Sequence, residues 1–309
     1  MVLPGGSEHT APDDLRQLAR HDAARTTVPG TAGPLAALDT GPGSRGTVLL
    51  VAGFTGSKED FAPLLAPLSA AGWRVVAVDQ RGQYESDGPD DPAAYTVDLL
   101  AADLVAVGRS LREDADGPLH LVGHSFGGLV ARGAVLADPG LYDSLVLLGS
   151  GPGGLTGPRA ELLEHLAPLL DAGGVPLVAQ TLQQLAMTDP RAMAVPATTR
   201  EFLDRRLAAN TEAGLRGMAE AMTTEPDRVA ELAATAVPVL VAHGEADDAW
   251  TPAVQADMAT RLGARHEVVA DSVHSPAIEA PARTLELLTD FWAAVPARPR
   301  VPDDSEVSA

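Results

Sequence analysis

The 309-residue chain contains no cysteine, and this absence removes several kinds of chemistry at once. Without thiols there can be no disulfide, no thiolate metal site and no cysteine nucleophile. Basic residues are also scarce, because 22 lysine and arginine residues stand against 42 aspartate and glutamate residues, giving a formal net charge of −20. A surface this acidic repels nucleic acids and anionic lipids. We therefore expect neither a nucleic acid nor a membrane among the partners.

Long apolar runs are missing as well. No segment has the length and apolar character needed to span a bilayer. Residues 1–14 have neither the basic start nor the apolar stretch of a signal peptide. These two absences predict a cytoplasmic protein. The apolar content of 45% is nevertheless ample for a large core.

Short apolar segments alternate with longer helical patterns along most of the chain. The predicted strands are residues 35–39, 47–52, 73–79, 119–122, 144–148, 237–243 and 265–270. The predicted helices between them are residues 58–71, 95–111, 126–136, 252–262 and 282–292. Several of the strands are apolar throughout, as in a parallel sheet that is covered on both faces. The alternation therefore predicts an α/β fold with a mostly parallel, doubly wound sheet.

The alternation stops between Gly149 and Ala236, where only helical patterns occur. We interpret residues 151–235 as a helical cap inserted between two strands, above the edge of the sheet where open α/β folds bind ligands. The core then comprises residues 27–150 and 236–294. Residues 1–26 form an N-terminal extension, in which the pattern of residues 14–24 is compatible with one exposed helix. Residues 295–309, rich in proline and acidic groups, are predicted to be a flexible tail.

The sequence Gly123-His124-Ser125-Phe126-Gly127 is the strongest functional motif. It follows an apolar strand and precedes a helix, the setting in which Gly-x-Ser-x-Gly exposes a nucleophilic serine at a sharp turn. The glycines lack a Cβ, so the turn can close against the sheet. The alternative is a glycine-flanked turn with a capping serine. Catalysis by Ser125 requires a base and an orienting acid elsewhere in the chain.

Both partners follow in the expected chain order. The apolar strand of residues 237–243 ends in His243-Gly244-Glu245-Ala246-Asp247-Asp248, and the last strand leads into Asp271-Ser272-Val273-His274. The order Ser125, Asp247, His274 is the one typical of a serine nucleophile on an α/β sheet. His274 is the histidine with the right order and element to act as the base.

Five segments together resemble the α/β-hydrolase superfamily. They are VLLVAGFTGS, VVAVDQRGQYES, LVGHSFGG, VPVLVAHGEADDAWTP and DSVHSPAIEAP, and the resemblance runs from about Pro34 to Trp292. It implies an α/β-hydrolase fold with a helical cap and a serine hydrolase that needs no metal and no cofactor. In this family the acid usually lies three residues after the glycine that ends its strand, which selects Asp247. Asp248 stays as a rival, because its distance to Pro252 also fits a common spacing.

The resemblance also implies an oxyanion hole made of two backbone N–H groups, those of Phe54 and Phe126. Many relatives have His-Gly where this chain has Ala52-Gly53, a difference expected to change loop packing more than chemistry. The segment from Asp79 to Gly82 matches a loop that the family uses structurally, and relatives often continue with His-Gly where this chain has Gln83-Tyr84.

A second group of residues has weaker functional signals. Trp250, Met187 and Met218 are candidates for the substrate pocket, although methionines at helical spacing are more often simple packing residues and Trp250 has a similar status. Glu85 and Asp87 lack histidines at ligand spacing, so we predict no metal site. The remaining histidines are assigned packing, hydrogen-bonding or solvent-exposed roles, with His243 as a possible support for the acid: His9, His21, His120, His124, His165, His243 and His266.

The predicted function is hydrolysis of a carboxylic ester of a small to medium, partly apolar substrate through an acyl-serine intermediate. The same triad would serve a thioesterase, a lactonase, a peptidase or a carbon–carbon bond hydrolase. A receptor-like protein that binds a small molecule with little turnover is the alternative outside enzymology. Sequence leaves the natural substrate and the oligomeric state open.

Overall fold

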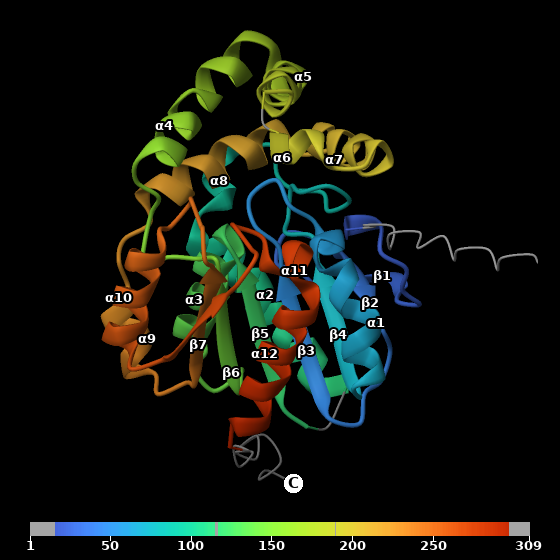
Figure 1. Cartoon of the computed structure of the whole chain (residues 1–309), viewed down its shortest axis with the longest axis vertical. Helices are drawn as coiled ribbons and strands as arrows, with labels where there is room; N and C mark the ends of the chain where they lie inside the picture. Colours follow the sequence, from blue (N-terminus) through green and yellow to red (C-terminus); the bar gives the residue numbers. More distant parts are fainter. Residues whose placement is uncertain (1–15, 115–116, 189, 297–309) are drawn as a thin grey trace, which may run out of the picture.

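A computed structural model describes residues 16–114, 117–188 and 190–296. Its centre is an eight-stranded sheet in the order β1-β2-β4-β3-β5-β6-β7-β8 (Figure 1). The strands are β1 (Ala24–Val28), β2 (Leu35–Asp39), β3 (Gly46–Val51), β4 (Trp73–Val78), β5 (Leu119–His124), β6 (Ser144–Leu148), β7 (Val239–Gly244) and β8 (Arg265–Val269). The six neighbouring strands β4, β3, β5, β6, β7 and β8 are parallel to one another. At one edge of the sheet, β2 pairs antiparallel with both β4 and β1.

Helices cover both faces of this sheet. One face carries α1 (Ala62–Ala70), α11 (Pro276–Glu279) and α12 (Pro281–Ala294); the other carries α2 (Val97–Asp114), α3 (Phe126–Ala137), α9 (Val229–Ala234) and α10 (Pro252–Leu262). Successive residues of β3 serve the two faces in turn. Val48 and Leu50 pack with α1 and α12, whereas Leu49 and Val51 pack with α2 and α3. Uniformly apolar strands are needed because both faces are buried.

The segment between β6 and β7 is helical, and Figure 1 shows its first helices above the carboxyl ends of the strands. They are α4 (Pro158–Glu164), α5 (Leu166–Ala186), α6 (Pro190–Met193), α7 (Ala197–Ala208) and α8 (Glu212–Thr224). Helix α5 is bent at Gly173 and Gly174, where the backbone leaves the helical conformation. A small apolar cluster that includes Leu166 and Leu215 joins α5 to α8. The division of the chain into a core and a cap domain stays a prediction.

The α/β fold predicted from the sequence is confirmed, and each of the seven predicted strands is present with ends within two residues. Two features differ. Strand β1 was not predicted, and the exposed helix over residues 14–24 is wrong for the described part of that range: Arg16–Leu18 is one 3-10 turn, and β1 begins at Ala24. His9 and residues 297–309 of the predicted tail lie outside the described residues.

In the described part of the chain, no single helix combines the length and apolar character needed to cross a membrane. The pair α4 and α5 satisfies the test jointly, by length and composition only, and its two helices are bent by 60° relative to each other.

Candidate active site

Ser125 stands at the turn between β5 and α3, with φ 54° and ψ −124°. Only glycine adopts such a backbone conformation readily, so the neighbouring structure must hold this serine in place. The flanking glycines show how tight the turn is. A Cβ on Gly123 would lie 2.3 Å from the carbonyl oxygen of Gly127, and one on Gly127 would lie 2.4 Å from that of Ala52. The turn therefore requires glycine at both positions.

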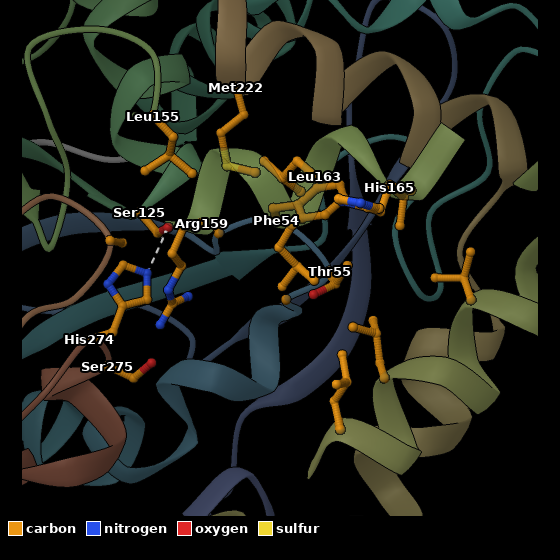
Figure 2. A pocket seen from close by; sticks show the side chains of 18 of the residues that line it. Phe54, Thr55, Ser125, Leu155, Arg159, Leu163, His165, Met222, His274 and Ser275 are labelled. Carbon is orange, nitrogen blue, oxygen red and sulfur yellow. Dashed lines mark hydrogen bonds between the residues drawn. The ribbon is translucent and has the colours of Figure 1, made fainter. Parts of the chain in front are cut away.

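His274 lies between Ser125 and Asp247, and Figure 2 shows its hydrogen bond to Ser125. Its Nε2 atom is 3.0 Å from the Ser125 hydroxyl, and its Nδ1 atom is 3.0 Å from Oδ1 of Asp247. A carboxylate can only accept, so Nδ1 donates to it and Nε2 is left to accept the serine proton. The three side chains come from the turn after β5, the loop after β7 and the loop after β8.

Asp247 is buried and fully engaged. Besides His274, its carboxylate accepts hydrogen bonds from the backbone N–H of Ala249 and from the side-chain amide of Gln255, both at 2.9 Å. Burial alone would raise the pKa of Asp247, but the hydrogen bond and charge of His274 and the two further donors lower it below its usual range. Asp248, the rival, points outward and pairs with Arg159. The hydrogen bonds thus join Asp247, and not Asp248, to His274.

His124 contacts the loop that carries His274 through a hydrogen bond to its backbone. Its Nε2 donates to the backbone carbonyl of His274 at 2.8 Å, and the two ring centroids are 5.1 Å apart. Burial, together with the nearby His274, lowers the pKa of His124 to about 4. The ring therefore stays neutral at neutral pH and keeps its donor fixed toward this carbonyl.

The backbone amides of Phe54 and Phe126 are the two donors predicted for the oxyanion hole. The N–H of Phe126 belongs to the first residue of α3 and has no acceptor within the helix. Phe54 follows Gly53, which packs so closely on the nucleophile that a Cβ there would lie 2.9 Å from Cβ of Ser125. Among the backbone hydrogen bonds of the described residues, none uses the Phe54 N–H. The oxyanion hole at Phe54 and Phe126 stays a prediction, supported by the contact of Gly53 with Ser125 and by the position of Phe126 next to Ser125 in the chain.

A cavity of about 690 Å³ extends from Ser125 and His274 to helices α4, α5 and α8 (Figure 2). Its base is polar and formed by the loops of the core. Its walls are apolar and come from the loops after β3 and β6 and from α4, α5 and α8: Phe54, Leu155, Leu162, Leu163, Leu166, Leu169, Val178, Leu182, Leu185 and Met222. An apolar cavity with a few polar groups at one end suits a small molecule with one polar reacting group.

Of the three candidates for the substrate pocket, Trp250 and Met218 line neither this cavity nor a second one, which corrects the prediction for them, whereas Met187 borders the second cavity. Trp250 is 4% exposed, packs on Gly151 and donates its indole N–H to the carbonyl of Gly153. Met218 is 1% exposed and belongs to the core beside the sheet. Met187 is 71% exposed at the end of α5 and borders a second cavity.

Met222, one helical turn after Met218, lines the cavity instead. His165, which we expected to be solvated, is exposed but also borders the cavity, and Arg159 lies at its edge near His274 (Figure 2). Helical spacing places Met218 and Met222 on similar faces, so only the packing of α8 decides which of them reaches the cavity.

His243, His266 and Glu85 take no part in the hydrogen bonds that join Ser125, His274 and Asp247. His243 is fully buried and bonds to the carbonyl of Gly244 and to His266, so it does not support Asp247. Glu85 pairs with Lys58 and Arg25. The described residues contain no cluster of three or more histidine, aspartate or glutamate side chains that could hold a metal ion.

The loop after β4 has the structural role predicted for it. Asp79 pairs with Lys58 at 2.7 Å, and Arg81 pairs with Asp103 at 2.6 Å, with all four side chains nearly inaccessible. Charges this deeply buried need such partners. These pairs anchor the loop after β4. The same loop carries Gln83, which donates to the carbonyl of Gly53 beside Ser125.

A family model for the alpha/beta hydrolase family matches residues 48–287. The chain belongs to this family. A putative carbamate hydrolase RutD of Variovorax paradoxus is 40% identical over 110 residues, so the match spans 36% of this chain but only 40% of the length of that relative. A putative 2-succinyl-6-hydroxy-2,4-cyclohexadiene-1-carboxylate synthase of Bacillus subtilis is 25% identical over 269 residues, 84% of this chain and 95% of its own.

Solved structures of alpha/beta hydrolases resemble the whole fold. A thermophilic esterase from Thermogutta terrifontis matches with a TM-score of 0.72 and 23% identity, over 88% of this chain and 99% of its own. An enol-lactonase from Burkholderia xenovorans matches with a TM-score of 0.71 and 21% identity, over 87% and 100%. At these identities the likeness shows the fold. Membership of the family makes the protein an enzyme of the hydrolase class.

Proposed function

We propose that this alpha/beta hydrolase cleaves carboxylic esters of small to medium, partly apolar molecules, with Ser125 as nucleophile. One observation carries the proposal: a continuous chain of hydrogen bonds joins the Ser125 hydroxyl, His274 and Asp247 at the base of an apolar cavity. A serine hydroxyl is a poor nucleophile unless a base accepts its proton, and the distances here allow that transfer.

In the acylation step, Nε2 of His274 takes the proton of Ser125 as its oxygen attacks the ester carbonyl. The Nδ1–H of His274 donates to Asp247, whose negative charge stabilises the imidazolium. The amides of Phe54 and Phe126 donate to the oxygen of the tetrahedral intermediate. When the intermediate collapses, the C–O bond breaks and His274 returns the proton to the departing alkoxide.

In the second step, His274 removes a proton from water, and the resulting hydroxide attacks the acyl-serine. When the second tetrahedral intermediate collapses, its C–O bond to Ser125 breaks, the acid leaves, and the imidazolium of His274 returns the proton to the serine oxygen. Ser125, His274 and Phe54 border the cavity, and no metal or cofactor enters the scheme.

Covalent labelling tests this proposal. A fluorophosphonate should label the wild type, fail to label Ser125→Ala and label His274→Ala slowly. A panel of esters, thioesters, lactones and aminoacyl amides should then give the highest kcat/KM with an ester, and this activity should be lost in Ser125→Ala. A wild type that binds small molecules but resists labelling would overturn the enzymatic mechanism, and a panel led by thioesters, lactones or amides would overturn the ester assignment.

A further inference from the structure

A second cavity of about 520 Å³ adjoins the first, between the end of α5 and α7. The two cavities share three lining residues: Thr55, Leu182 and Arg206. Thr55 comes directly after Phe54, and Leu182 lies near the C-terminal end of α5. We call this junction the neck. Through it, the apolar wall above Ser125 continues into the second cavity.

The neck has little free charge. The guanidinium of Arg206 pairs with the carboxylate of Asp60, which also accepts a hydrogen bond from Gln17. Its charge is therefore already neutralised, and an anionic group of a ligand would have to displace Asp60. Beyond the neck, most of the wall is apolar and includes Ala186, Val195, Leu203 and Leu207, while Arg200, which donates to the carbonyls of Met193 and Val195, and Asp204 also line it. An apolar group is the chemistry that fits there.

We propose that the second cavity binds the far end of a long, unbranched apolar chain of an ester whose carbonyl lies at Ser125. This inference rests on the proposed function and narrows its substrate class. Each methylene that leaves water adds up to about 0.8 kcal/mol, so kcat/KM should rise by at most about fourfold for each added carbon that enters the cavities. The increase should continue past the chain length at which the first cavity is full.

Two substrate series distinguish which half of the ester carries the chain. One series varies the acyl chain of p-nitrophenyl esters from acetate to palmitate, and the other varies the alcohol of alkyl acetates over the same lengths. Each is measured below its solubility limit with the wild type and two variants. Ala186→Trp fills the second cavity, and Ala172→Trp makes the same change at an exposed position of α5 that lines neither cavity.

In at least one series, Ala186→Trp should lower the ratio of kcat/KM for the dodecyl chain to that for the butyl chain by about tenfold or more. Ala172→Trp should leave this ratio unchanged. Equal ratios in both variants, or a wild type that prefers the shortest chains in both series, would overturn the inference. A wild type that hydrolyses no ester and resists fluorophosphonate would instead overturn the proposed function.

A different set of contacts concerns the oxyanion loop. The carbonyl oxygen of Gly53 accepts two hydrogen bonds, one from Nε2 of Gln83 and one from the backbone N–H of Gly56, both at 3.0 Å. Gln83 is 1% exposed, and within the described structure its Oε1 atom has no hydrogen-bond partner. A buried side-chain donor of this kind restrains the peptide whose carbonyl it bonds.

The Gly53 carbonyl and the Phe54 N–H belong to one planar peptide unit, and in a trans peptide they point in opposite directions. Holding the carbonyl toward Gln83 therefore directs the N–H the other way, toward the side on which Gly53 contacts Ser125. Donors to the carbonyl also polarise the peptide and strengthen its N–H as a donor. We infer that Gln83 is a positioning residue that aims and strengthens the Phe54 amide for the oxyanion.

Gln80 provides a matched control. Its Nε2 donates to the carbonyl of Ala52 at 2.9 Å, one peptide earlier, and its Oε1 is likewise unpaired. That carbonyl shares its peptide plane with the N–H of Gly53, not with that of Phe54. Loss of Gln80 removes a similar buried hydrogen bond from the same loop without releasing the proposed oxyanion donor.

The test compares Gln83→Met with Gln80→Met, using a short ester and an alkyl boronic acid that mimics the tetrahedral intermediate. Gln83→Met should lower kcat by about tenfold to a hundredfold with little change in KM, and should weaken boronate inhibition by a similar factor. Gln80→Met should have a smaller effect on both. Equal losses in the two variants, or wild-type boronate affinity in Gln83→Met, would overturn the inference.

If Gln83→Met does not fold, Gln83→Leu removes the same donor with a shorter apolar side chain. It should show the same selective loss of kcat and of boronate affinity. A wild type without esterase activity would contradict the proposed function and not the geometry of this peptide.

Discussion

The imidazole of His120 stacks on the indole of Trp292, with ring centroids 5.3 Å apart and ring planes 11° from parallel. Trp73 meets both rings edge-on. His120 is almost completely buried, and its Nδ1 atom is 2.8 Å from the hydroxyl of Ser144. Burial lowers its pKa from 6.5 to about 4. The ring is therefore neutral in the folded protein at neutral pH.

Stability should consequently decrease on acidification through this window. Between pH 6.5 and about 4, His120 is protonated in the unfolded chain but not in the folded protein, so lower pH favours unfolding. The contribution is fully present above pH 6.5 and is at most about 3 kcal/mol. Urea unfolding across this range should show the slope. In His120→Phe this dependence of the free energy of unfolding on pH should become weaker, and the part that comes from His124 should remain. A variant with the full wild-type slope would contradict the contribution assigned to His120.

Because the backbone of Ser125 is strained, we expect this serine to lower the stability of the folded protein. Its φ of 54° with ψ of −124° favours glycine, so Ser125→Gly relieves strain that Ser125→Ala retains. Because glycine also adds entropy to the unfolded chain, the net gain is about 1 kcal/mol. Both variants should be inactive. Thermal unfolding should show Ser125→Gly to be the more stable of the two, and the opposite order would contradict strain at this turn.

The sequence predicts the sheet well where burial leaves a clear pattern, and fails where it does not. Strands such as β3 are apolar at nearly every position because helices cover both faces. Strand β1 has the sequence ARTTV, and its first four residues are exposed. Its only strand neighbour is β2, so it forms through backbone hydrogen bonds that leave no apolar alternation to detect.

Local sequence motifs likewise predict the residues of the candidate triad better than they predict the residues that line the cavity. The chain order of Ser125, Asp247 and His274 is a sequence property, and the fold brings these side chains into hydrogen-bond contact. The walls of the cavity depend on how the inserted helices pack. Trp250 could equally well face the cavity or the core, and only the fit of its indole against Gly151 decides for the core.

The two neighbouring aspartates should differ sharply in their effect on activity. Asp247→Asn keeps the shape of the side chain but no longer favours the Nδ1–H tautomer of His274, so kcat should fall by about a thousandfold or more. Asp248→Asn only removes an exposed pair with Arg159 and should change kcat by less than about threefold. Steady-state kinetics with one ester compares them. A larger loss in Asp248→Asn than in Asp247→Asn would identify Asp248 as the acid and contradict the assignment to Asp247.

The pair of Arg206 and Asp60 joins α7 to the core beneath it, and its loss should be costly. Burial opposes ionisation of Asp60, but the charge of Arg206 and hydrogen bonds from Gln17 and Arg206 hold its pKa below the usual range. Arg206→Met leaves this ionised carboxylate without its cation. We expect the free energy of unfolding to fall by about 3 kcal/mol in urea titrations at neutral pH.

The double variant Asp60→Asn with Arg206→Met separates the charge from the packing. An uncharged amide needs no cation, so the double variant should recover most of the stability that Arg206→Met loses. Acid provides a second route to the same result, because protonating Asp60 removes the unpaired charge. The gap in stability between the wild type and Arg206→Met should therefore narrow as the pH falls through the titration of Asp60 in the variant. A double variant as unstable as Arg206→Met would show that the arginine stabilises α7 by packing and not by its charge.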